Sequence, residues 1–250
     1  MKALAVIGYH HTGKTTMVTA IIAELKQRGF SVVSIKDIHS EAYRADTDGK
    51  NTALHAKAGS EAVFAKGLYD SALLFPRSLD LKEMLSYLKA DFLIIEGMKN
   101  APVPKLVCAE STDQLDELID GTAIGISGII SDHLNDYAGL PVFCLQKDMS
   151  RLMDTILTKT FDILPVSDPE CCSECGFTCY TMAENIVLGK ATRSDCVLDG
   201  NPDIKLSIGG EELVIVPFVQ KILRDAILSM VDNLKDIDPK GKISIEIRRD

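Results

Sequence analysis

A glycine-rich motif close to the N-terminus is the first set of residues whose types and spacing suit a chemical role. Residues 8–16 read Gly-Tyr-His-His-Thr-Gly-Lys-Thr-Thr, which satisfies the pattern G-x-x-x-x-G-K-[ST] directly after a short apolar run. In such a loop, glycines let backbone N–H groups wrap around a phosphate, a lysine bridges the β- and γ-phosphates, and a hydroxyl ligates Mg²⁺. We therefore expect a nucleotide phosphate site in which Lys14 holds phosphates and Thr15 holds the metal. The alternative is an ordinary strand-to-helix turn that contains glycine.

An acidic residue near the metal completes a site of this kind, and a later apolar run supplies one. Residues 91–97 read Asp-Phe-Leu-Ile-Ile-Glu-Gly. Ligands of open α/β sheets lie at the carboxyl ends of strands, where Glu96 falls, whereas Asp91 begins the strand and is expected at the far edge. We expect Glu96 to act on Mg²⁺ through water or to position the attacking water. The alternative is a strand that merely ends in a solvated acid.

Two polar features near this edge of the sheet are less specific. The stretch from Lys36-Asp37 to Asp46-Thr47-Asp48-Gly49-Lys50-Asn51-Thr52 is either a switch that contacts the γ-phosphate or a second substrate, or a solvated loop. His10 and His11 lie within the phosphate loop, and we expect them to point to solvent.

Cysteines form the second chemical feature, because five of the seven fall between residues 171 and 196. Four of them are spaced as ligands of a single metal centre: Cys172, Cys175, Cys179 and Cys196. Four thiolates are consistent with zinc and with a [4Fe–4S] cluster, and free thiols are the third alternative. Cys171 is an alternative ligand to its neighbour Cys172. Cys108 and Cys144 stand alone in apolar stretches and are expected in the core.

Composition limits the partners and the compartment. The chain has 27 Lys and Arg against 36 Asp and Glu, a formal net charge of −9, so a general basic field for nucleic acid is not expected. No run approaches the roughly 18 apolar residues that a transmembrane helix needs, so no membrane association is expected either. We expect a cytoplasmic protein, whose reducing surroundings argue against a disulfide framework.

The elements that must position these residues follow from the hydrophobic pattern. Short apolar runs alternate with amphipathic stretches from residue 1 to about residue 161, which predicts an α/β fold with a doubly wound, mostly parallel sheet. The expected strands are Ala3–Gly8, Ser31–Lys36, Asp91–Glu96, Ala123–Ser127 and Pro141–Leu145. A helix is expected after the first strand, with Gly29 as its stop, and another from about Leu79, with Ser78 as its N-cap. Glu61–Lys66 and Ser71–Phe75 suggest an additional hairpin.

After Pro165 the pattern changes to that of a smaller, cysteine-containing α+β domain. Ile204–Ile208 and Glu212–Val216 flank Gly209-Gly210 and predict a hairpin, followed by a helix from Pro217 and a strand over Ile243–Ile247. We therefore divide the chain into a nucleotide-binding domain over residues 1–160, a cysteine-rich segment over 166–200, and a ββαβ segment over 201–250 that packs with it.

Several of these motifs together resemble the molybdopterin-guanine dinucleotide biosynthesis protein B (MobB) family. The resemblance covers about residues 1–160 and rests on the phosphate loop, the stretch from Asp46 to Gly59, the Ile95-Glu96-Gly97-Met98-Lys99 signature and Pro104-Lys105. It implies a GTP-binding P-loop protein, often dimeric, that assists the transferase joining GMP to molybdenum or tungsten molybdopterin. The chain departs from the family pattern at Asn51, where Gly-Lys-Asp is usual, and at Met98, where an aromatic residue is commoner.

Carried over position by position, the resemblance implies roles for individual residues. The phosphates and Mg²⁺ would be held by Gly8, Thr12, Gly13, Lys14, Thr15 and Thr16. Glu96 and Lys99 would face the nucleotide. A loop for a second substrate would contain Asp46, Gly49, Lys50 and Thr52. Guanine specificity comes from the resemblance alone, because Gln146-Lys147-Asp148 lacks the spacing of the Asn/Thr-Lys-x-Asp element that reads guanine in many GTPases.

The cysteine segment resembles a small iron–sulfur domain found in redox and corrinoid proteins. The likeness is carried by Cys175-Gly176, Ala183, Gly189 and Cys196. It favours a [4Fe–4S] cluster over zinc. That domain commonly has four residues between its second and third cysteines, and this chain has three, which leaves open whether Cys171 or Cys172 is the first ligand.

Three functions are consistent with these features. The first is an accessory protein of molybdenum or tungsten dinucleotide cofactor biosynthesis, homodimeric and weakly active as a GTPase, with GTP, Mg²⁺ and an added cluster as cofactors. Its partners would be molybdopterin and its guanylyltransferase. The second is a nucleotide-driven electron-transfer or reductive-activation protein. The third is a non-catalytic adaptor that presents pterin to a partner.

Overall fold

Five parallel strands form the central sheet of the computed structural model, in the order β2-β5-β1-β6-β7. The structure describes residues 1–166, 175–196, 198, 204, 206–208, 211–213, 215, 217–234, 243 and 245. The strands are β1 Lys2–Gly8, β2 Val32–Lys36, β5 Phe92–Glu96, β6 Lys105–Cys108 and β7 Ala123–Ser127. All neighbours in this sheet pair in parallel, so the predicted α/β fold with a mostly parallel sheet is confirmed.

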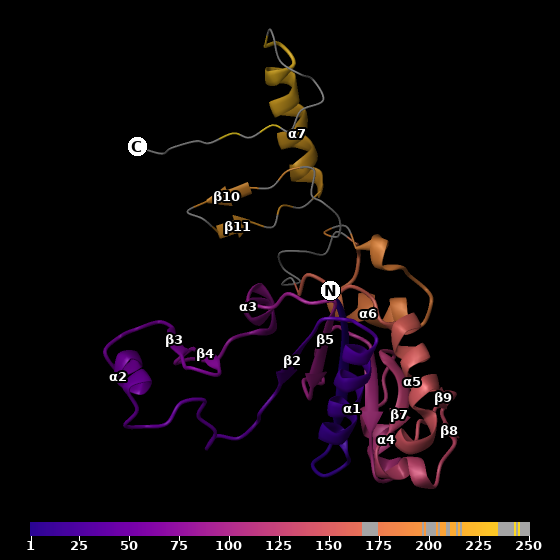
Figure 1. Cartoon of the computed structure of the whole chain (residues 1–250). Coiled ribbons are helices and arrows are strands. Elements are labelled where there is room, and N and C mark those ends of the chain that lie inside the picture. Colours follow the sequence, from indigo (N-terminus) through magenta and orange to yellow (C-terminus); the bar gives the residue numbers. More distant parts are fainter. Residues whose placement is uncertain are drawn as a thin grey trace.

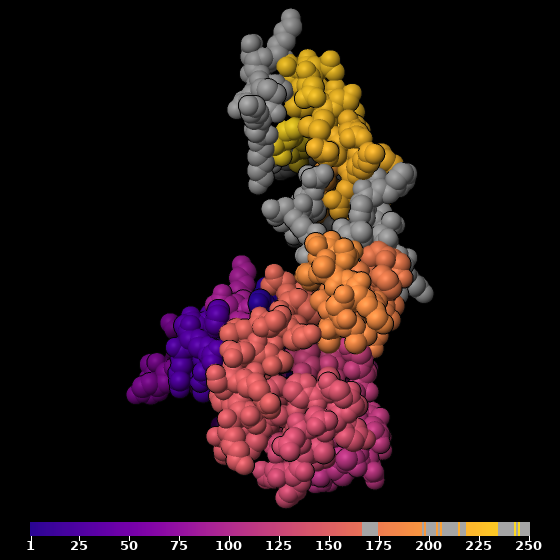
Figure 2. All heavy atoms as spheres, turned by 90° about the vertical axis from the view of Figure 1, so that its right-hand side faces the viewer, coloured from indigo at the N-terminus to yellow at the C-terminus, as the bar shows by residue number. Residues whose placement is uncertain are grey.

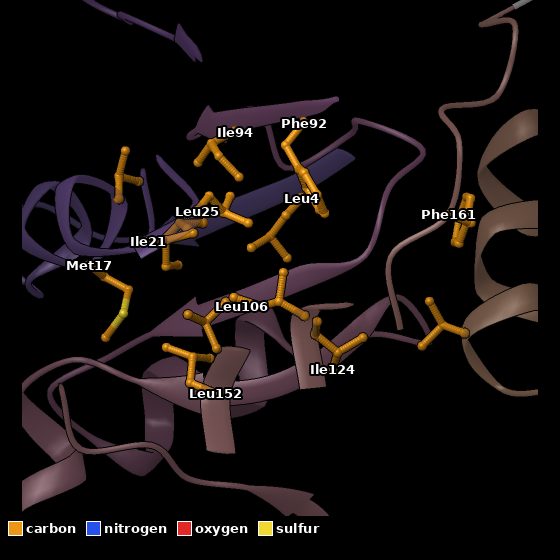
Figure 3. Close-up of a cluster of buried hydrophobic side chains, with 14 of the residues drawn as sticks. Leu4, Met17, Ile21, Leu25, Phe92, Ile94, Leu106, Ile124, Leu152 and Phe161 are labelled. Atoms are coloured by element: carbon orange, nitrogen blue, oxygen red, sulfur yellow. The ribbon is translucent and has the colours of Figure 1, made fainter. Parts of the chain in front are cut away.

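Helices cover both faces of the sheet, because the central strands are apolar on both sides. One face carries α1 Lys14–Gln27 and α5 Leu145–Lys159, and its core includes one residue from each of three strands: Leu4, Ile94 and Leu106 (Figure 3). The other face packs α3 Leu81–Ser86 and α4 Thr112–Leu118 against Ala3, Ala5, Ile7, Leu93, Ile95 and Val107. This two-sided burial holds the carboxyl ends of β1, β2 and β5 at one common edge.

Four of the five predicted strands of the sheet are confirmed within a residue, and the fifth is wrong. Residues 140–141 form the two-residue strand β9, Leu140–Pro141, which pairs antiparallel with β8, Asp136–Tyr137. Val142 makes one parallel bridge to Ile126, and helix α5 begins at Leu145. The fifth strand of the sheet is β6, which lies between β1 and β7 and which the sequence did not predict.

The predicted end of α1 is correct, whereas the predicted N-cap of α3 is wrong. Helix α1 ends at Gln27, and Gly29 takes the positive φ of 87° expected of a stop. The N-cap of α3 is Asp80 rather than Ser78, because Asp80 and Glu83 form a reciprocal capping box. Helices α2 Asn51–Lys57, α4 and α5 had not been predicted.

The predicted hairpin between the second strand and α3 is confirmed. Strands β3 Val63–Lys66 and β4 Ser71–Leu74 pair antiparallel. Together with α2 they form an arm that extends away from the five-stranded sheet (Figure 1). The arm exposes large apolar side chains, since Phe64 is 69% exposed and Leu73 is 39% exposed.

The cysteine-containing segment packs directly on the sheet. Helix α6, Cys179–Val187, contributes Met182, Ala183 and Val187 to the same hydrophobic cluster as α1 and α5. Figure 2 shows this segment in orange against the body of the sheet. The short 3₁₀ turns are η1 Ile129–Asp132 and η2 Arg193–Asp195.

Beyond α6, a hairpin and a helix match the predicted order of elements. Strand β10 Leu206–Ile208 pairs antiparallel with β11 Glu211–Leu213, and α7 runs over Pro217–Val231. Of the last predicted strand only residues 243 and 245 are described, so that prediction stays untested. No helix within the described part of the chain has the length and apolar character needed to cross a membrane.

Candidate functional site

The phosphate loop joins β1 to α1 at the carboxyl edge of the sheet, where the sequence placed it. Gly13 is the N-cap of α1 with φ of 92°, and Gly8 has φ of 154°. Gly8 is pressed against strand β6, because a Cβ atom there would lie 2.2 Å from the carbonyl oxygen of Cys108. The loop therefore needs glycine at both positions for a conformational or a spatial reason.

A cavity of about 1140 Å³ opens beside this loop. It is lined by the phosphate loop, the segment that follows β2 and the segment that follows β5: Ile7, Gly8, Tyr9, His10, His11, Gly13, Lys14, Thr15, Thr16, Lys36, Asp37, Ile38, His39, Ser40, Glu96, Gly97, Met98, Lys99 and Asn100. Its volume lies at or slightly above the range of roughly 300–1,000 Å³ typical of small-molecule sites. The cavity thus has room for a nucleotide.

Thr15 and Glu96, which are 81 positions apart in the sequence, meet in this cavity. The Thr15 hydroxyl donates to Glu96 Oε1 at 2.7 Å, and the Lys36 ammonium donates to the same oxygen at 2.9 Å. Burial alone would raise the pKa of Glu96, but the hydrogen bonds from Lys36 and Thr15 outweigh it and hold the pKa below its ordinary value. Glu96 is therefore an ionised carboxylate at neutral pH.

Lys14 points back over the loop, where its ammonium donates to the Tyr9 carbonyl oxygen. Burial lowers the pKa of Lys14, the charges of Lys36 and Lys99 lower it further, and Cys108 and Glu96 oppose the shift. Three ammonium groups, Lys14, Lys36 and Lys99, therefore line the cavity together with the carboxylates of Asp37 and Glu96, which makes this part of an acidic protein suitable for an anion.

These groups also form a donor set that fits Mg²⁺. A threonine hydroxyl and a carboxylate are the hard oxygen ligands that this ion prefers, and Mg²⁺ usually keeps several waters and adds phosphate oxygens. Lys14 and Thr15 are the first two residues of α1, so both lie at a helix N-terminus, where phosphates bind.

Tyr9, Lys99 and Glu117 form a second polar group at the cavity, which the sequence did not predict as a unit. The Lys99 ammonium lies 4.7 Å from the centre of the Tyr9 ring, and the Tyr9 hydroxyl donates to Glu117. The hydrogen bond to Glu117 raises the pKa of Tyr9. Lys99 therefore lies beside the phosphate loop, and its implied contact with a nucleotide stays a prediction.

The structure places the histidines at the cavity and Thr12 inside the phosphate loop. His10 and His11 are exposed, as predicted, and both still line the cavity. His39 lies 3.0 Å from Asp37 at the cavity wall. Thr12 is buried and its hydroxyl donates to the Tyr9 carbonyl at 2.9 Å, so it supports the loop from within.

Four residues of the predicted second-substrate loop do not line the cavity. They lie in the segment that leads into α2 or in α2 itself: Asp46, Gly49, Lys50 and Thr52. Lys50 is the N-cap residue of α2, and the Asp46 carboxylate accepts from the backbone N–H of Thr47 at 2.8 Å. The structure thus assigns them local contacts and leaves their role as a prediction.

Three of the predicted cluster cysteines are described, whereas Cys171 and Cys172 lie outside the described residues. Cys175, Cys179 and Cys196 all pack in the cluster that also holds α1, and Cys196 is 5% exposed. Burial raises the pKa of Cys196, with added contributions from Cys179 and Cys175. Among the described residues, no group of three or more Cys, His, Asp and Glu side chains is arranged to hold a metal ion.

The two isolated cysteines are core residues, as predicted. Cys108 and Cys144 are both buried free thiols, and burial raises the pKa of Cys108 to about 12. The Cys108 side chain is therefore an apolar component of the core at the end of β6.

A parallel, helix-covered sheet with a phosphate loop between β1 and α1 defines this chain as a P-loop protein. The profile of the family described as "Molybdopterin guanine dinucleotide synthesis protein B" (MobB) matches residues 3–132. The chain belongs to the MobB family.

Relatives support this membership over different lengths. The putative molybdopterin-guanine dinucleotide biosynthesis adapter protein of Methanocaldococcus jannaschii is 30% identical, over 99% of this chain and 97% of the relative. The probable adapter protein of Bacillus subtilis is 32% identical, over 55% of this chain and 82% of the relative. The crystal structure of Bacillus subtilis MobB aligns with a TM-score of 0.53 at 26% identity, covering 62% of this chain and 98% of that chain. The chain is thus a MobB-like biosynthesis adapter protein.

Proposed function

We propose that the chain is a GTP-binding adaptor of molybdopterin guanine dinucleotide biosynthesis that hydrolyses GTP slowly. Family membership supports the pathway. The observation that carries the nucleotide role is the 2.7 Å contact between Thr15 and Glu96 beside Lys14, because it brings a metal-binding hydroxyl and an acid to one end of a phosphate loop.

Within this proposal each residue at the loop has a defined task. Backbone N–H groups from Gly8 to Thr16 surround the phosphates, and Lys14 turns from the Tyr9 carbonyl to bridge them. Thr15 ligates Mg²⁺, while Glu96 holds a metal-bound water or orients the attacking one. Bound Mg²⁺ would neutralise the charge that develops on the phosphates. Guanine as the base rests on the family resemblance.

The proposed partners are molybdopterin, its guanylyltransferase and a second copy of this chain. The exposed apolar face of the β3–β4 arm, with Phe64 and Leu73, supports the homodimer, since such surfaces on soluble proteins mark contacts with other chains. The proposed contacts to the second substrate are in α2 or in the segment that leads into it: Asp46, Gly49, Lys50 and Thr52.

A [4Fe–4S] cluster is the proposed cofactor of the C-terminal part, with zinc as the alternative metal. Its proposed ligands are Cys172, Cys175, Cys179 and Cys196, with Cys171 as the alternative to Cys172. Burial raises the pKa of Cys196, and the support for a shared site is the electrostatic effect of Cys179 and Cys175, which both raise that pKa further. In this view residues 1–160 bind the nucleotide, residues 166–200 hold the cluster, and residues 201–250 pack with them.

Binding measurements test the nucleotide proposal. Purified protein is titrated with GTP and ATP in the presence of Mg²⁺, with and without molybdopterin, and compared with Lys14→Ala and with the control Lys82→Ala, an exposed lysine of α3. We expect GTP to bind better than ATP, and Lys14→Ala to weaken binding while the control does not. Equal loss in both variants, or no nucleotide binding by the wild type, would contradict the proposal.

Iron analysis tests the cluster separately. Anaerobically purified protein is expected to absorb near 400 nm, as iron–sulfur clusters do, and Lys14→Ala is expected to retain its iron. Colourless protein with stoichiometric zinc would establish the alternative metal. Cys108→Ala serves as the control and should also retain its iron, since this core thiol is not a proposed ligand.

A second candidate function is nucleotide-driven electron transfer or reductive activation. The observation in its favour is that α6, which begins at Cys179, packs in the same cluster as α1, which begins at the phosphate loop. A preference for ATP, no interaction with pterin, and a nucleotide-dependent change in the potential of the cluster would support this function over the adaptor.

A further inference from the structure

Lys36 occupies an unexpected place in the nucleotide cavity. It is the last residue of β2, and the parallel register puts it directly beside Glu96, the last residue of β5. Its ammonium donates to Glu96 Oε1 at 2.9 Å, the same oxygen that accepts from Thr15. A lysine thus holds the carboxylate that the proposed function places beside Mg²⁺, where it would hold a metal-bound water or orient the attacking one.

Bound Mg²⁺ would conflict with this arrangement. The ion would lie near the Thr15 hydroxyl and Glu96, where it repels a neighbouring ammonium twice as strongly as a monovalent cation at the same distance. Lys36 and the metal therefore cannot share the carboxylate without loss of affinity. When Mg²⁺ binds, either Lys36 or the metal must therefore bind another anion.

The side chain of Lys36 has the freedom and the surroundings to make such a change. It is 56% exposed and lines the cavity, whereas the Glu96 side chain is 11% exposed and held in place by Thr15. Of the other lysines of the cavity, Lys14 already serves the phosphate loop and Lys99 lies over the Tyr9 ring. Lys36 is the lysine whose partner would be taken by the metal.

We propose that Lys36 exchanges Glu96 for the terminal phosphate when Mg²⁺ and a nucleoside triphosphate bind, and so distinguishes triphosphate from diphosphate. This inference rests on the proposed nucleotide function. In the nucleotide-free protein Lys36 keeps Glu96 positioned and its charge balanced. With a triphosphate bound, the flexible ammonium gains a phosphate oxygen, whereas a diphosphate offers it no third phosphate to contact.

The test compares binding of GDP and of a non-hydrolysable GTP analogue, each at saturating Mg²⁺. Lys36→Met removes the charge, and Lys36→Gln removes it while keeping a donor for Glu96. Both are expected to bind the analogue about 10-fold or more weakly, the effect of losing a hydrogen bond to a charged group, with GDP affinity little changed. Lys36→Arg should keep most of the preference, and Lys82→Met on α3 should behave as the wild type.

Metal dependence gives a second measurement that needs no turnover. Without the competing ammonium, Lys36→Met and Lys36→Gln should reach half-maximal GDP binding at a lower Mg²⁺ concentration than the wild type. An unchanged ratio of analogue to GDP affinity in both variants, or an equal loss for both nucleotides, would overturn the inference. Failure of the wild type itself to bind either nucleotide would instead count against the proposed function.

Discussion

Lys105 lies beneath the cysteine segment, with its ammonium 4.3 Å from the centre of the Tyr180 ring. Lys105 begins β6 and is fully buried, and its ammonium also lies 3.2 Å from Asp120 Oδ2. Tyr180 follows the proposed cluster ligand Cys179 and donates to Asp120. Burial lowers the pKa of Lys105, and the charge of Asp120 opposes that shift. The segment that carries the cysteines thus helps to satisfy a buried lysine of the sheet.

Tyr180→Phe tests this contact. Loss of the hydroxyl leaves Asp120 and Lys105 short of a partner in a part-buried site, so we expect a loss of about 1–3 kcal/mol in the free energy of unfolding. The measurement is urea denaturation of metal-free protein. Tyr137→Phe is the matched control, because its hydroxyl donates to Asp116 at 2.7 Å on the exposed surface. A loss no larger than that of the control would show that the buried network contributes little.

Gly128→Ala is expected to weaken nucleotide binding, although Gly128 does not line the cavity. The residue has φ of 91°, and a Cβ atom there would lie 2.4 Å from the carbonyl oxygen of Thr12 in the phosphate loop. The loop would have to shift, and the N–H groups that hold phosphate would shift with it. Gly29→Ala has a similar φ of 87° but open space around the Cβ position, so it isolates backbone strain. Titration with GTP decides: equal affinities of the two variants would contradict this mechanism.

Ser31→Ala is expected to raise the pKa of Asp91. The hydrogen bond from the Ser31 hydroxyl is the main cause that holds this pKa below its ordinary value, and the backbone N–H of Ser31 adds to it. A carboxyl group with a lowered pKa in the folded state stabilises the protein above about pH 3.9, and the contribution is lost as the pH falls. NMR titration measures the change. Ser86→Ala, whose hydroxyl donates to a backbone carbonyl, should leave Asp91 unchanged.

Alkylation of the folded, metal-free protein should distinguish the core thiol from the segment thiols. Cys108 is fully buried and its pKa is raised to about 12, so it should stay unmodified near neutral pH. Cys175 is partly exposed and should react with iodoacetamide. Mass spectrometry of peptides locates the modification, and protein unfolded in denaturant provides the control in which both react. Equal rates in the folded protein would show that burial does not protect Cys108.

The phosphate loop and Glu96 were predictable because their signals are local. The loop is a contiguous motif after a strand, and Glu96 ends an apolar run of the length of a buried strand. The hairpin of the arm and the burial of Cys108 and Cys144 followed from similar short patterns. In each case a short stretch of neighbouring residues is enough for the prediction, and the rest of the fold need not be known.

Strand β6 escaped prediction because its sequence does not resemble a buried strand. It has only four residues and begins with a lysine that follows a proline. Residues 141–145 have the more apolar pattern, yet their last residue starts α5. A lysine can be buried at the start of β6 because its ammonium contacts Asp120 and Tyr180, and no short window of sequence shows this compensation.

The sequence by itself determined the class of the protein: a P-loop within an α/β fold, the acid that faces it, and a family resemblance that the comparisons confirm. Only the tertiary structure decided which distant groups share a site. Lys36 meets Glu96 across 60 positions, and Lys105 meets Tyr180 across 75. Those contacts depend on strand order and register, which arise from the packing of the whole sheet and have no local signature along the chain.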